Sequence, residues 1–98
     1  MAPDGDETVW SEEEYVTYLR GERRRFAWVM RRYGGLSPSE AEAAALNRYP
    51  YEPSDEAYRG LIFHDEAWHW AMLELYGDSY WIDRPELTHP SPEYRALD

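Results

Sequence analysis

Hydrophobic residues recur every three or four positions between residues 12 and 33, which is the spacing of one face of an α-helix. Ser11 and Glu14 have the spacing of a capping box, and acidic residues fill the first turn, where they favour the positive end of the helix dipole. Gly34 and Gly35 follow the last hydrophobic position and supply a stop. We therefore predict a long helix over residues 12–33. Its hydrophobic positions are Tyr15, Tyr18, Leu19, Phe26, Val29, Met30 and Tyr33.

A second start signal lies at Ser37, with Pro38 at the first helical position and Glu40 able to close a capping box. It predicts a short, alanine-rich helix that runs to Tyr49. Pro50 then begins a turn.

After this turn, Ser54 or Asp55 could cap a third helix, whose hydrophobic pattern runs to Tyr76 and stops before Gly77. Gly60 lies inside that pattern, where glycine costs about 1 kcal/mol relative to alanine. We expect a bend or a split of the third helix at this glycine.

From residue 78 onward the helical spacing ends, and three prolines interrupt the chain. We expect an extended C-terminal arm over residues 78–98 that packs on the helices or on a partner. Four hydrophobic residues are the candidate contacts of this arm: Tyr80, Trp81, Ile82 and Leu87.

The chain of 98 residues is long enough for one hydrophobic core. Residues 1–10 form an acidic lead that we expect to be disordered, and residues 11–77 form the helical domain. The predicted fold is all-α: a small three-helix bundle of two long helices and one short helix, followed by the C-terminal arm.

Two acidic residues, Glu22 and Asp65, interrupt the hydrophobic faces of the two long helices. A buried carboxylate without a partner costs several kcal/mol, so each must be paired, protonated, bound to a metal or displaced to the rim. Asp65 can reach His69, four residues further on. The arginines within one helical turn of Glu22 are Arg20, Arg23, Arg24 and Arg25. Ion pairs within the chain are therefore the first interpretation of both acids.

A metal site is the alternative interpretation. Glu66 and His69 have Glu-x-x-His spacing, which places a carboxylate and an imidazole on one helical face, and Asp65 could join them. This spacing resembles that of ferritin-like carboxylate bundles, in which a glutamate from another helix completes the site, and Glu22 could supply it. A two-metal site of that kind needs a second Glu-x-x-His pair, so it would form across a homodimer. Fe, Mn or Zn would be the ion.

Composition and charge exclude several classes of function. Twenty acidic residues and ten arginines give a net charge of −10, which argues against nucleic acid and anionic membranes as partners. The chain has no cysteine for thiolate chemistry, and its first ten residues are acidic, unlike a secretory signal. We expect a cytoplasmic protein. The serines before the predicted helices are explained as caps, and we find no catalytic constellation and no cofactor motif.

The remaining interpretation is a protein-interaction or regulatory module that is not an enzyme. Its aromatic residues are five Trp, nine Tyr and two Phe, and such side chains fill cores and also dominate binding hot spots. Thirteen of the acidic residues follow residue 33, so the expected partner is a basic protein, or a second copy of the chain.

Overall fold

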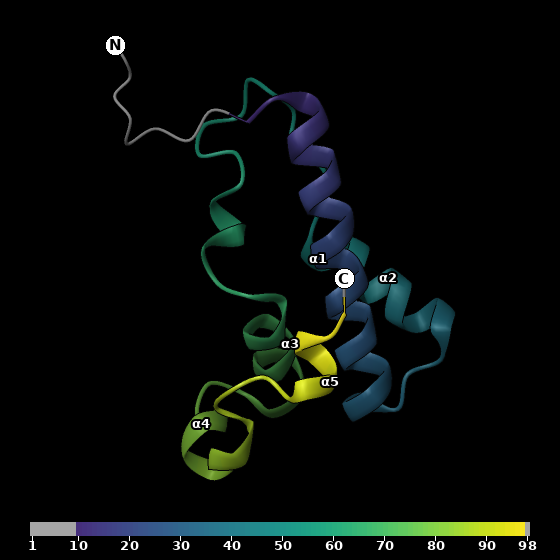
Figure 1. Ribbon diagram of the computed structural model, residues 1–98, viewed down its shortest axis with the longest axis vertical. Coiled ribbons are helices and arrows are strands. Elements are labelled where there is room, and N and C mark those ends of the chain that lie inside the picture. The colour runs from purple at the N-terminus through teal and green to yellow at the C-terminus, as the bar shows by residue number, and fades with distance from the viewer. Residues whose placement is uncertain (1–9, 98) are drawn as a thin grey trace.

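The structure, a computed structural model, describes residues 10–97. This part of the chain is helical and contains no strand (Figure 1). The α-helices are α1 (Glu12–Gly34), α2 (Pro38–Arg48), α3 (Ala67–Tyr76), α4 (Tyr80–Asp83) and α5 (Pro92–Arg95), and two 3₁₀ turns are η1 (Leu61–His64) and η2 (Pro85–Leu87). The all-α class is confirmed. Residues 1–9 of the predicted acidic lead lie outside the described part of the chain. Its last residue, Trp10, lies inside it.

The long helix α1 is the element against which α2 and α3 both pack (Figure 1). It begins with the predicted capping box, in which the backbone N–H of Glu14 donates to Ser11 Oγ and the N–H of Ser11 donates to Glu14 Oε1. It ends at Gly35, which takes the left-handed conformation with φ of 71°. The boundaries predicted for α1 are therefore correct to one residue. The capping box of α2 at Ser37 and Glu40 is also present.

The third helix differs from its prediction. Residues 54–60 form turns, η1 follows, Asp65 is extended, and α3 begins only at Ala67. A helix split at Gly60 is not observed, because the residues before it form turns; the φ of Gly60 is 84°, and an added Cβ would lie 2.7 Å from the Trp10 indole nitrogen. A helix continuing through this position would lose both the left-handed turn and the contact with Trp10.

Arg59 explains why the segment before η1 leaves the helical conformation. Its guanidinium lies 2.6 Å from Glu12 Oε1, donates to the Glu52 carbonyl oxygen at 3.0 Å, and sits 3.8 Å above the centre of the Tyr15 ring. The N–H of Gly60 donates to Glu52 Oε1. These contacts tie residues 52–60 to the first turns of α1 and replace the hydrogen bonds of a helix.

One hydrophobic core joins all the α-helices. Its buried members are Tyr15, Leu19, Phe26, Val29, Met30, Ala41, Ala45, Tyr49, Ala67, Trp68, Ala71, Met72, Tyr80, Leu87 and Tyr94. Trp68 is 2% exposed, and the rings of Tyr33 and Tyr94 meet it edge-on with centroids 5.3 and 5.4 Å away. Since Tyr94 belongs to α5, the C-terminal segment is part of this core.

The predicted extended arm is instead a chain of short helical turns. Trp68 Nε1 donates to the Leu87 carbonyl oxygen at 2.9 Å, and the Trp68 backbone N–H donates to the Tyr94 hydroxyl at 3.2 Å. The Tyr80 hydroxyl lies 2.9 Å from His69 Nδ1. The prolines do not prevent these turns, because Pro85 and Pro92 occupy first-turn positions, where no helical N–H is required.

No helix among the described residues has the length and apolar character needed to cross a membrane.

Candidate functional site

The Glu22 carboxylate is buried at the contact between α1 and the N-terminus of α3. Glu22 is 6% exposed, and its Oε2 lies 3.3 Å from Arg25 Nη1. Burial raises the pKa of Glu22, with a smaller contribution from the nearby Glu66, while Arg25 and the Ala67 N–H oppose the rise. The expectation that Glu22 occupies a core position and is paired within the chain is confirmed.

Tyr94 caps α3 from outside that helix. The N-cap residue Glu66 makes no capping hydrogen bond with its side chain. The N–H of Trp68, in the first turn of α3, instead donates to the Tyr94 hydroxyl. The start of α3 therefore depends on a residue of α5.

Three of the four candidate metal ligands, Glu22, Glu66 and His69, have separate partners in this conformation. Glu66 forms a bidentate pair with Arg95, at 2.8 and 3.3 Å, and His69 Nδ1 is held by the Tyr80 hydroxyl. Asp65 follows η1 and is partly exposed. Across residues 10–97, no three His, Asp or Glu side chains form a cluster that could hold a metal ion. A site shared across a homodimer stays a prediction.

The raised pKa of Glu22 predicts a pH-dependent difference between the wild type and Glu22→Gln. The folded protein holds the Glu22 proton more tightly than the unfolded chain does, so wild-type stability relative to the variant should rise as pH falls from about 7 toward 4.5. The slope for this one group is at most about 1.4 kcal/mol per pH unit. Urea unfolding of both proteins across this range measures it. Glu12 and Glu40, whose pKa values are lowered, are common to both proteins and cancel. A constant difference, or one of opposite sign, would contradict the assignment.

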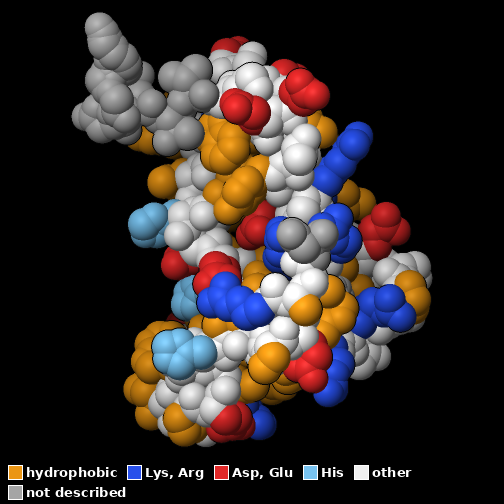
Figure 2. All heavy atoms as spheres, in the orientation of Figure 1, with side chains coloured by type: hydrophobic (Ala, Val, Ile, Leu, Met, Phe, Trp, Pro, Cys, Tyr) orange, Lys and Arg blue, Asp and Glu red, His pale blue; other side chains and the backbone are white. Residues whose placement is uncertain are grey.

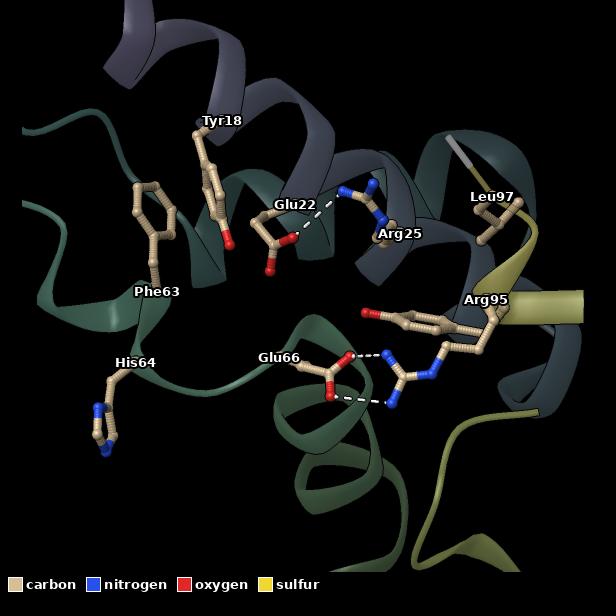
Figure 3. A pocket seen from close by; sticks show the side chains of 9 residues that line it. Tyr18, Glu22, Arg25, Phe63, His64, Glu66, Arg95 and Leu97 are labelled. Carbon is tan, nitrogen blue, oxygen red and sulfur yellow. Dashed lines mark hydrogen bonds and ion pairs between the residues drawn. The ribbon is translucent and has the colours of Figure 1, made fainter. Parts of the chain in front are cut away.

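A pocket of about 520 Å³ opens beside Glu22, between α1, the segment joining η1 to α3, and α5 (Figure 3). It is lined by Tyr18, Glu22, Arg25, Phe63, His64, Glu66, Tyr94, Arg95 and Leu97. The carboxyl groups of Glu22 and Glu66 lie on opposite sides of it, and each is paired with an arginine (Figure 3). Aromatic rings and carboxylates thus line the same hollow.

The structure divides the four candidate interaction residues into two pairs. Tyr80 and Leu87 are buried at 3% and 9% exposure, whereas Trp81 and Ile82 are 44% and 68% exposed. Hydrophobic side chains gather on the surface over α4 (Figure 2). We call the exposed Trp81 and Ile82, with the neighbouring acids Asp78, Asp83 and Glu86, the α4 tip. Within the described part of the chain, none of these three acids has an ion-pair partner.

Sequence reasoning missed Tyr94, Arg95 and Arg59 as organising residues. A signal for the first two was present, because Ser91 and Pro92 repeat the Ser-Pro helix start seen at Ser37 and Pro38. Arg59 carried no local signal, since its role depends on Glu12, which lies 47 residues earlier in the chain, at the start of α1.

We compared the chain with protein-family models, with curated proteins and with solved structures, and none of the three comparisons gave a match.

Proposed function

We propose that this protein is a non-catalytic interaction module that binds a basic protein through the α4 tip. The observation that carries the proposal is the adjacent exposure of Trp81 and Ile82 on a segment that is otherwise anchored in the core. Large apolar side chains on a fixed element are the usual centre of a protein-binding surface.

The anchoring of α4 supports this proposal because it holds the two side chains in place before binding. Tyr80 is hydrogen-bonded to His69, and the Leu87 carbonyl oxygen accepts from Trp68 Nε1, on either side of the exposed pair. The Trp81 ring also packs edge-on against Tyr80, with centroids 5.4 Å apart. A surface fixed in this way loses little conformational entropy when a partner docks.

Charge supports a basic partner. The chain carries a net charge of −10, and the exposed acids Asp78, Asp83 and Glu86 lie within five residues of the exposed pair in the sequence, without ion-pair partners among residues 10–97. The one arginine of this surface, Arg84, lies 4.5 Å over the Tyr76 ring. An acidic rim around apolar anchors accelerates encounter with a cationic partner and repels an acidic one.

Selection of peptides from a random display library against the folded protein tests the proposal. We expect the enriched peptides to carry net positive charge and to lose binding to Trp81→Ser/Ile82→Ser. The matched control is Tyr58→Ser/Leu61→Ser, which removes two hydrophobic side chains of 81% and 64% exposure from another surface. Neutral or acidic peptides, or equal loss in both variants, would overturn the proposal. Dimerisation of the wild type that is abolished by Trp81→Ser/Ile82→Ser would replace the basic protein by a second copy of the chain.

A further inference from the structure

The pocket beside Glu22 combines an aromatic wall with two carboxylates. The rings of Tyr18 and Phe63 pack against each other with centroids 4.6 Å apart and form one side. Glu22 and Glu66 contribute carboxylates from two different elements (Figure 3). Aromatic faces and carboxylates together suit a cation with a flat or apolar body, because the rings attract the cation and the acids neutralise it.

Two carboxylates and two arginines line the pocket, and the carboxylates act on its tyrosines. Burial followed by the charge of Glu22 raises the pKa of Tyr18, and burial raises the pKa of Tyr94 to about 12, with Glu22 and Glu66 both adding to the rise. Arg25 offsets these effects only in part.

We propose that the pocket binds a guanidinium group, the side-chain head of an arginine. The site already contains this chemistry, since Arg95 forms a bidentate guanidinium pair with Glu66. Both members of that pair are about half exposed, at 58% and 50%, so the pair adds little stability and can exchange for an incoming guanidinium. The source of the guanidinium follows from the proposed function, on which this part of the proposal rests. It is an arginine of the basic partner.

One partner segment can reach both the pocket and the α4 tip. Helix α3 begins at the pocket with Ala67 and leads at its other end into α4. Its 10 residues span about 15 Å, which an extended peptide covers in about five residues. The partner would then present an arginine and an apolar residue at that separation.

An NMR titration with N-acetyl-arginine amide tests the pocket directly. We expect saturable chemical-shift changes at Tyr18, Tyr94 and Leu97. The dissociation constant should be on the order of 1 mM, because a small probe makes few contacts. N-acetyl-citrulline amide has the same shape without the charge and should bind at least about tenfold more weakly.

Glu66→Gln should weaken binding of the arginine probe at least about tenfold. Its matched control is Glu74→Gln, which also removes an exposed ion pair with an arginine, Arg48, but lies outside the pocket and should change nothing. Trp81→Ser/Ile82→Ser should bind the probe like the wild type, so failure at the α4 tip and failure at the pocket are separate results. Equal binding of the citrulline probe, or equal effects of Glu66→Gln and Glu74→Gln, would overturn the proposal.

The source of the guanidinium is tested with a peptide selected on the wild-type protein. If its arginine enters the pocket, replacing that arginine with citrulline weakens binding to the wild type at least about tenfold, and much less to Glu66→Gln. If the peptide shows no such coupling while the free probe binds, the site takes a small guanidinium compound and not a partner side chain.

Discussion

Replacing Trp68 with alanine is expected to lower the free energy of unfolding by about 3–5 kcal/mol. The side chain is 2% exposed and packs between the rings of Tyr33 and Tyr94. Its loss also leaves the Leu87 carbonyl oxygen without its donor. A domain of this size is stable by about 5–15 kcal/mol in total, so the substitution should remove a large fraction of that stability.

Urea unfolding followed by circular dichroism measures this effect. The matched control is Trp81→Ala, which removes the same side chain from a position that is 44% exposed and should change stability by less than about 1 kcal/mol. Similar losses in the two variants would mean that Trp68 does not hold the C-terminal segment to the helices.

Ending the chain after Gly77 is the second large effect, and we expect it to abolish cooperative unfolding. The truncation removes three buried side chains, Tyr80, Leu87 and Tyr94, each of which contributes about 1.5–3 kcal/mol through burial. It also removes the acceptor of the Trp68 backbone N–H at the start of α3. The summed loss of roughly 5–9 kcal/mol is comparable to the whole stability of such a domain.

A chain that ends after Leu87 is the graded control for this truncation. It keeps Tyr80 and Leu87 and loses Tyr94, so it should still unfold cooperatively, at a midpoint below that of the full chain. Thermal melts of the three proteins measure how far each truncation lowers stability. A sharp transition for the chain that ends after Gly77, at the midpoint of the full chain, would show that the helices fold without the C-terminal segment.

The elements that sequence predicted best are those with local signals. The capping boxes at Ser11 and Ser37 satisfy N–H groups within three residues, so their hydrogen bonds can be inferred without knowledge of the fold. The predicted start of the third helix was wrong, and the contact between Arg59 and Glu12, which ties residues 52–60 to α1, joins residues far apart in the chain. Local propensity had no access to that pair.

In the candidate site, too, local patterns could be predicted and contacts between distant residues could not. Periodicity placed Glu22 on a buried face, and the structure agrees. Its place beside the N-terminus of α3 depends on how two helices pack, which could not be inferred from spacing. The split of the interaction residues into buried Tyr80 and exposed Trp81 likewise depends on how α4 turns against His69.

The C-terminal segment thus has two parts, one buried and one exposed. Through Leu87 and Tyr94 it completes the core, and between these anchors and α3 it presents Trp81 and Ile82 to solvent. Since truncation removes both parts at once, function is better tested by substitutions at the exposed pair.

The most direct test of the account is the ratio of dissociation constants of one selected basic peptide for Trp81→Ser/Ile82→Ser and for the wild type. We predict a ratio of at least about one hundred, equivalent to about 2.7 kcal/mol, and a ratio below about three for Tyr58→Ser/Leu61→Ser. Equal ratios for the two double variants, with both proteins folded, would contradict binding through the α4 tip.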